Sequence, residues 1–217
     1  MTTIGSYSDL TSTVIEYLGR DQDTTLIARI PTFVQFCEAK LNRLLMTRQM
    51  EQRSITVFNT SATEPQYIAL PSDSQSMRSI KLTSTSPAVR LDYKSKAEID
   101  EYRSSTGDVT NQPLFFTIFG NEIEFCPTPD QNYTAEMIYR QNIPSLLSNS
   151  TNWVLTLAPD LYLYGTLLES APYIKEDARI ATWGAGFTAA LANLNDLSET
   201  STFNAGPLEM RISGVTP

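Results

Sequence analysis

Residues 159–172, PDLYLYGTLLESAP, are the stretch on which the fold prediction rests. Pro159 suits the first turn of a helix, and apolar side chains then recur at helical spacing up to Pro172. The recurring residues are Leu161, Tyr164, Leu167 and Leu168. A helix that is apolar on nearly every side must be covered by other elements, so helices elsewhere in the chain have to pack around it.

The N-terminal residues supply two such helices. Ser6-Tyr7-Ser8-Asp9 has the form of a capping box, and a short apolar stripe follows it until Gly19. The stripe consists of Leu10, Val14 and Leu18. After the polar turn 21–24, Pro31 favours the first turn of a second helix. Its predicted core stripe is Val34, Cys37, Leu41, Leu44 and Leu45, and its predicted solvent face is Gln35, Glu38, Asn42 and Arg43.

A fourth helix is predicted after Glu176 and Asp177, whose carboxylates suit the positive end of a helix dipole. Its apolar stripe is Ile180, Trp183, Phe187, Leu191 and Leu194. Residues 200–217 show no period and contain several turn-forming residues, so we expect an extended C-terminal arm.

Between the two helical ends the period changes from helical to alternating, which is typical of half-buried strands. The predicted strands lie around 55–58, 66–70, 79–82, 89–93, 115–119, 122–125 and 134–139. Gly120-Asn121 separates two of them and suits a two-residue hairpin turn. A small helix is expected at 96–102. The region reads as an antiparallel β module.

The predicted fold class is therefore α+β: a four-helix core from both chain ends, an inserted antiparallel β module and an extended C-terminal arm. The predicted boundaries are 1–52 for the first half of the helical core, 53–150 for the β module, 151–199 for the second half and 200–217 for the arm.

The composition argues against an enzyme and against a tight nucleic-acid binder. With 24 acidic and 16 basic residues, the net charge of −8 is opposite to the basic stripe that grips phosphates. The sequence has no histidine and no phosphate-cradling or dinucleotide glycine motif. Lys40, Arg43, Arg48 and Arg53 are interleaved with acids and are interpreted as structural. No catalytic residue, cofactor or metal is predicted, and no apolar run is long enough for a membrane span.

Two pairs of acidic residues are the candidates for a catalytic or a metal site. Glu122 and Glu124 share a strand face, as a catalytic carboxylate pair could, but acids alternating with Ile123 and Phe125 are better interpreted as the solvent side of a half-buried strand. Asp21 and Asp23 lack the glycine and glutamate of a calcium loop and are interpreted as a turn. The two cysteines, Cys37 and Cys126, are expected to be reduced core thiols.

Four stretches resemble the head-to-tail adaptor (connector) proteins of tailed bacteriophages, in particular those of short-tailed phages. They are Ile30–Arg43, Leu70–Asp73 leading into Met77-Arg78, Leu114–Pro129, and Thr151–Leu155 with Ala158–Gly165. Together they span most of residues 4–198 in order, and the order carries the resemblance because no single piece is a catalytic signature.

The resemblance implies a structural virion protein at the head-tail junction, assembled in the host cytoplasm. It implies a ring of twelve copies that binds the portal protein and a downstream nozzle or tube protein. DNA would pass through the ring on ejection without tight binding, and the C-terminal arm would reach the portal. The arm's apolar residues Phe203, Leu208, Met210 and Ile212 are the candidate contacts with the portal or a neighbouring copy. The alternatives are another tail or baseplate binding module, and a peptidoglycan hydrolase that uses the Glu122 and Glu124 carboxylates.

Overall fold

The computed structural model describes residues 3–107, 109–175 and 177–203, and it has the α+β character that the sequence predicts. The chain divides into two compact units. One is helical and comprises Met1–Gln49 and Ile143–Pro217; the other is Met50–Asn142, which contains all the strands. Each unit is considered by itself below.

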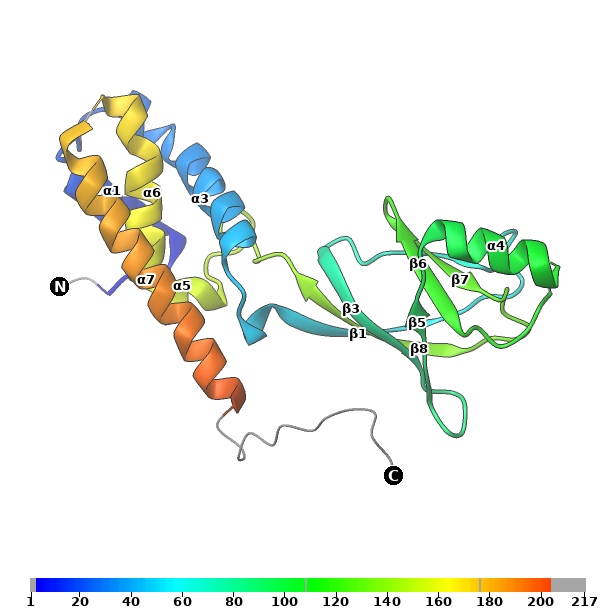
Figure 1. The fold of residues 1–217 in the computed structure, drawn as a ribbon. Coiled ribbons are helices and arrows are strands. Elements are labelled where there is room, and N and C mark those ends of the chain that lie inside the picture. The colour runs from blue at the N-terminus through cyan, green and yellow to red at the C-terminus, as the bar shows by residue number, and fades with distance from the viewer. Residues whose placement is uncertain (1–2, 108, 176, 204–217) are drawn as a thin grey trace. The chain divides into compact units, whose positions relative to one another are not determined.

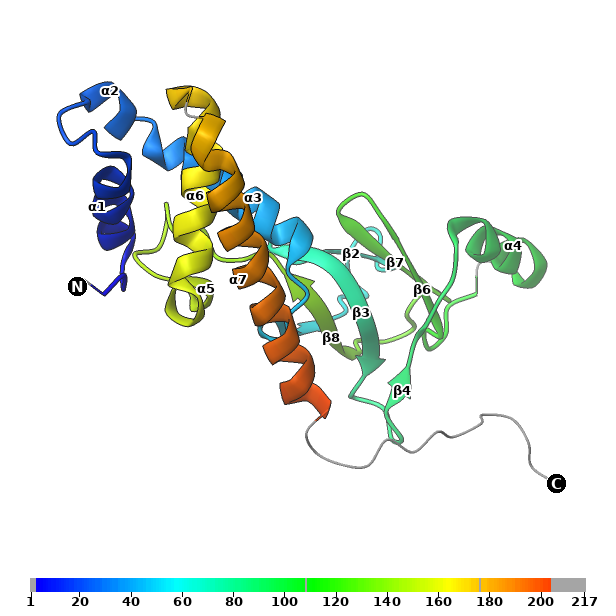
Figure 2. The same ribbon diagram turned by 60° about the vertical axis from the view of Figure 1, so that its left-hand side comes forward.

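The helical unit is built around one central helix (Figures 1 and 2). Its elements are α1 (Tyr7–Leu18), α2 (Thr24–Ile27), α3 (Ile30–Leu44), α5 (Trp153–Leu157), α6 (Pro159–Ile174) and α7 (Asp177–Phe203). α6 packs against α1, α3, α5 and α7. Its buried residues point in all directions, as the apolar sequence predicts. They are Leu161, Tyr162, Leu163, Gly165, Thr166, Leu167, Ser170, Ala171 and Ile174.

Local sequence signals set the limits of these helices. The backbone N–H of Asp9 donates to Ser6 Oγ at 3.2 Å, and Gly19 ends α1 in the left-handed region at φ 63°. Asp23 caps α2, a helical turn that was not predicted and that begins at Thr24, the last residue of the predicted polar turn 21–24. α6 continues two residues beyond Pro172, because a proline in the last turn removes only one helical hydrogen bond.

The prediction for α3 is wrong at two positions, Glu38 of the predicted solvent face and Leu44 of the predicted core stripe. Glu38 is buried, whereas Leu44 is 42% exposed. At 100° per residue, Glu38 follows the buried residues Val34 and Cys37 on the core face. Leu44 has nearly the same direction as Cys37, but it is the last residue of α3 and is exposed there. α3 therefore turns Leu41 and Leu45 inward and carries a carboxylate into the core.

The strand-containing unit consists of two four-stranded sheets and one helix. Its elements are β1 (Glu51–Val57), β2 (Tyr67–Ala69), β3 (Ser74–Leu82), β4 (Val89–Arg90), β5 (Asp92–Tyr93), α4 (Lys96–Thr106), β6 (Phe115–Phe119), β7 (Glu122–Cys126) and β8 (Thr134–Gln141); a 3-10 turn, Arg48–Met50, precedes β1. The strand orders are β1-β8-β3-β4 and β2-β7-β6-β5. The pairing is antiparallel except between β5 and β6. The hairpin predicted at Gly120-Asn121 is present, with Gly120 at φ 57°.

The two sheets enclose a common core. Residues from the first sheet, such as Ile80 and Met137, cluster with Phe116 and Phe125 of the second. The outer face of the second sheet is covered by α4, whose Ile99 is buried and whose Tyr102 ring lies 5.5 Å from that of Phe115 (Figure 1). The order of layers is thus first sheet, core, second sheet, α4.

Candidate assembly interface

The outer face of α3 carries large apolar side chains in water. Phe36 is 52% exposed and, at 100° per residue, lies on the same side of the helix as the exposed residues Ala39 and Arg43. Leu44, the last residue of α3, is 42% exposed. An exposed helix face that carries a large aromatic residue is a candidate for burial against another protein surface.

The outer face of α7 is different, because it is made of small residues. Exposed alanines recur at helical spacing, and no charged residue occurs between Arg179 and Asp196. The alanines are Ala181, Ala185, Ala189 and Ala192. Small, uncharged side chains allow another helix to approach the backbone closely at a low cost of desolvation.

The helices that carry these two faces are packed tightly against α6. A Cβ atom added at Gly165 of α6 would clash with Cys37 Sγ of α3 and would lie 3.1 Å from Cε2 of Phe187 on α7. On the other side, a Cβ at Gly186 of α7 would lie 3.0 Å from the Tyr164 ring. Glycine therefore permits the close approach of α3, α6 and α7, which fixes the two outer faces relative to each other.

A buried carboxylate fixes the chain where it returns from the strands to the helices. Glu38 Oε1 accepts from the backbone N–H of Leu146 at 2.7 Å, and Glu38 Oε2 accepts from Ser145 Oγ at 2.7 Å. The Tyr162 hydroxyl donates to Oε1 at 3.4 Å and itself accepts from Asn152 Nδ2 at 2.7 Å. These bonds satisfy a charge that would otherwise be costly to bury.

Burial in the same region disfavours ionisation of two side chains, Cys37 and Tyr162. Burial, together with the nearby Glu169 and Glu38 carboxylates, raises the pKa of the Cys37 thiol well above its usual range. Burial likewise raises the pKa of the Tyr162 hydroxyl. Cys37 and Cys126 are both buried, as predicted, and neither belongs to a disulfide. A buried cysteine held as a thiol has no nucleophilic role.

The end of α7 holds the segment that leaves α3. The backbone N–H of Met46 donates to Asn195 Oδ1 at 3.2 Å, and that of Arg48 donates to Ser198 Oγ at 2.9 Å. Lys40, within α3, forms a 3.2 Å ion pair with Glu169 of α6 and lies over the Phe187 ring of α7. The interpretation of Lys40 as structural is confirmed by these contacts.

The two carboxylates considered for catalysis lie in unlike environments. Glu122 is exposed, whereas Glu124 is fully buried beneath α4, which corrects its prediction as a solvent-facing residue. Glu124 Oε2 pairs with Lys96 Nζ at 2.7 Å and Oε1 with Arg103 Nη1 at 2.6 Å. α4 covers this face of β7, and the ion-pair cluster joins α4 to the sheet.

Of the four contact residues predicted for the C-terminal arm, the structure describes the position of Phe203 alone. α7 continues to Phe203, four residues into the range expected as the arm, and the position of Phe203 is at the end of that helix. Leu208, Met210 and Ile212 lie outside the described residues.

The comparison with known families agrees with the resemblance seen in the sequence. The family model described as SU10 adaptor protein matches residues 6–211, nearly the whole chain. The chain belongs to the SU10 adaptor protein family. No curated protein matches the chain.

Membership of the adaptor family gives the protein a structural role in a bacteriophage. Among the described residues, no helix has the length and hydropathy to cross a membrane, and no three potential ligand side chains are grouped as a metal site would require. The exposed Phe36 was not among the predicted contact residues, although an aromatic residue outside a helix's core stripe is a sequence signal for such a candidate.

Proposed function

We propose that this adaptor forms a ring, of twelve copies, that joins the portal protein to the next tail component and surrounds the path of the DNA. The observation that carries the proposal is the adaptor-family match over residues 6–211 in a chain whose helical unit leaves apolar faces in water. The ring would be part of the virion at the head-tail junction, after assembly in the host cytoplasm.

The outer faces of α3 and α7 support contacts between neighbouring copies. A ring requires two different surfaces on each subunit that fit each other, so that every copy contacts the next in the same way. The large side chains of Phe36 and Leu44 and the small residues of α7 are complementary in size. In this proposal α3 of one copy packs against α7 of the next.

The sequence beyond α7 supports a contact with the portal. Leu208, Met210 and Ile212 are apolar residues among turn-forming ones, and such a segment can bury them on a partner surface. The proposal assigns residues 204–217 to the portal contact or to a neighbouring copy, with Phe203 at its start.

The charge of the chain suits a passage for DNA. A surface with net charge −8 repels phosphates, so DNA would move through the ring without being held by the protein.

The test is binding of the full chain to its portal, measured by co-sedimentation and electron microscopy. Phe36→Glu should prevent ring closure, because it places a charge in the middle of the proposed contact. Tyr17→Glu on α1 is the matched control, because Tyr17 is 51% exposed, nearly the same as Phe36. Normal rings from Phe36→Glu would refute the α3 contact, and a wild-type chain that does not bind portal would refute the adaptor function.

A chain ending at Phe203 tests the portal contact separately. It retains every helix that the structure describes, so it should fold normally and lose affinity for the portal. Undiminished binding by this truncated chain would show that the contact lies elsewhere.

A further inference from the structure

The outer face of the first sheet is basic, although the protein as a whole is acidic. Strand pairing brings Ile55, Glu136, Lys81 and Arg90 into one row across β1, β8, β3 and β4. Directly paired residues share a sheet face, so Lys81 and Arg90 project together. Five of the chain's 16 basic residues belong to this basic sheet face: Arg53, Arg78, Lys81, Arg90 and Arg140.

Acids on the same face neutralise only part of this charge. Glu136 pairs with Arg53 Nε at 2.6 Å and with Lys81 Nζ at 3.1 Å, and Glu51 pairs with Arg78. The two cations hold the pKa of the Glu136 carboxyl below its usual value. Arg90 is exposed and has no ion pair among those found in the described residues. A hollow of about 280 Å³ lies between Arg78, Lys81 and Arg90 and is large enough for a carboxylate side chain.

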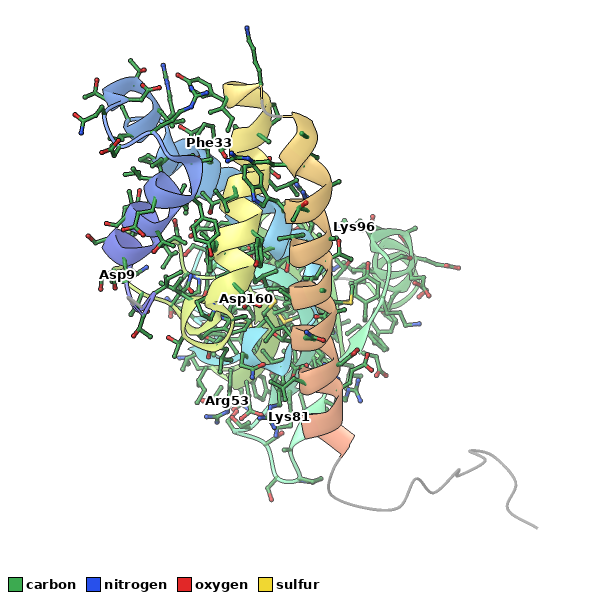
Figure 3. All side chains as sticks on the ribbon, turned by 90° about the vertical axis from the view of Figure 1, so that its left-hand side faces the viewer. Asp9, Phe33, Arg53, Lys81, Lys96 and Asp160 are labelled. Carbon is green, nitrogen blue, oxygen red and sulfur yellow. The ribbon has the colours of Figure 1, made fainter. Side chains whose placement is uncertain are left out.

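The opposite side of the same unit is acidic. α4 covers the second sheet, on the far side of the core from the basic sheet face. Figure 3 shows Arg53 and Lys81 together and Lys96 of α4 away from them. Glu101 lies about 200° around α4 from the buried Ile99, so it points directly outward. The exposed acids Glu98 and Asp100 flank it, and we call these three residues the acidic helix face.

We propose that the basic sheet face binds the acidic helix face of a second copy of this chain, in a head-to-tail contact that repeats around the ring. The proposal rests on the proposed ring and names the pair of surfaces through which the strand-containing units meet. Because the two faces are on opposite sides of one sandwich, each copy can use one face for each neighbour, which a cyclic assembly needs.

Charge complementarity favours a copy of the chain over DNA as the partner. A DNA-binding face gains affinity from each phosphate that its cations neutralise, but Glu136 and Glu51 already occupy three of these cations and would repel phosphates. The hollow, which Glu136 also lines, has room for a single carboxylate side chain beside Arg90, a cation of this face that has no ion pair within the part of the chain that the structure describes. A DNA backbone would instead bring several phosphates past Glu136 and Glu51. On the acidic helix face, Glu98 and Asp100 pair with Lys94 at 3.6 Å and Lys96 at 3.0 Å, and Glu101 presents an outward-pointing carboxylate of this kind.

The test uses charge reversals in the full chain. Arg90→Glu and Glu101→Arg each change one exposed residue for which the structure gives no internal ion pair. Arg20→Glu and Glu16→Arg, both exposed positions around the end of α1, are controls with the same change in net charge. Self-association is measured by sedimentation velocity at about 50 mM and about 1 M salt, where the Debye length falls from roughly 14 Å to roughly 3 Å.

The proposal predicts a specific pattern. Wild-type chains and both controls associate at low salt, and each single reversal on the proposed faces weakens association about tenfold or more. The double variant Arg90→Glu/Glu101→Arg recovers the wild-type level, because opposite charges face each other again. An equal mixture of the two single variants also associates at low salt, in alternating order, because the reversed charge at position 90 of one variant faces the reversed charge at position 101 of the other and the unchanged Arg90 faces the unchanged Glu101. All differences disappear at about 1 M salt.

Other outcomes would overturn the proposal. The first is that Arg90→Glu associates as strongly as the wild type. The second is that the double variant associates as weakly as the single variants. The third is that the wild type shows no salt-dependent self-association, either alone or on the portal. Binding of a labelled DNA duplex by the wild type that is lost in Arg90→Glu, with self-association unchanged, would assign the face to phosphates. Wild-type binding to portal is measured in parallel: its failure beside intact self-association would refute the adaptor function and leave this contact standing.

Discussion

The close packing of three helices at Gly165 leads to a prediction opposite in sign to that from helix propensity alone. Replacing a mid-helix glycine by alanine ordinarily stabilises a helix by about 1 kcal/mol. At Gly165, however, the new methyl group would clash with Cys37 Sγ and crowd the Phe187 ring at 3.1 and 3.2 Å. Neither neighbour is the free end of a flexible side chain, because both are buried.

The size of the effect follows from these two terms. Overpacking a filled core costs about 1–3 kcal/mol, and a clash with a buried sulfur atom belongs at the upper end of that range. After the gain in helix propensity, Gly165→Ala should lower the free energy of unfolding by about 2 kcal/mol. Gly184 is the matched control, because its added Cβ would meet only Leu168 Cδ1 at 4.0 Å. Gly184→Ala should be neutral or slightly stabilising.

Tryptophan fluorescence is the suitable assay, because the only two tryptophans, Trp153 and Trp183, both belong to the helical unit. Thermal melts should show Gly165→Ala about 8 °C below the wild type, at roughly 4 °C per kcal/mol. The double variant Gly165→Ala/Cys37→Ala should recover part of this loss, since it removes the sulfur atom that the methyl group meets. Equal stability of the Gly165→Ala and Gly184→Ala variants would refute the packing argument.

Three further predictions concern buried and charged groups. Glu38→Ala should lower the free energy of unfolding by about 3 kcal/mol in urea titrations and Glu38→Gln by less, because alanine leaves buried donors unpaired whereas the amide keeps one acceptor. Cys37 and Cys126 should react with a thiol reagent at pH 8 only as fast as the chain unfolds, and rapid labelling of the native protein would contradict their burial. Because the pKa of Glu136 is lowered on folding, its contribution is present above about pH 4.5 and is lost as pH falls through the folded value, so Glu136→Gln should flatten the acid limb of a stability profile.

The helices and strands follow from the sequence because their signals are local. The apolar stripe of α7, the Ser6 cap of α1 and the Gly120-Asn121 hairpin each depend on residues a few positions apart. The all-round apolar character of α6 also predicted its central place. Such features need no knowledge of distant contacts.

The polar interior could not be predicted in the same way. Glu38 and Glu124 read as solvent-facing acids, yet both are buried, because their partners come from distant parts of the chain. Glu38 accepts hydrogen bonds from Ser145 and Leu146, more than a hundred residues away. Glu124 pairs with Lys96 of α4. Whether a charged side chain is buried depends on the partners available to it, and the spacing of apolar residues along the sequence does not identify these partners. The parallel pairing of β5 with β6 is likewise a long-range feature.

The most direct test of the adaptor proposal is the number of copies bound to one portal ring. Native mass spectrometry of the purified full chain mixed with its portal gives this number from the mass of the complex. The account predicts that twelve copies bind together as a closed ring, with few partly filled intermediates, because each copy is held by two neighbours as well as by the portal. A chain that does not bind portal, or that binds as isolated copies filling the sites independently, would contradict it.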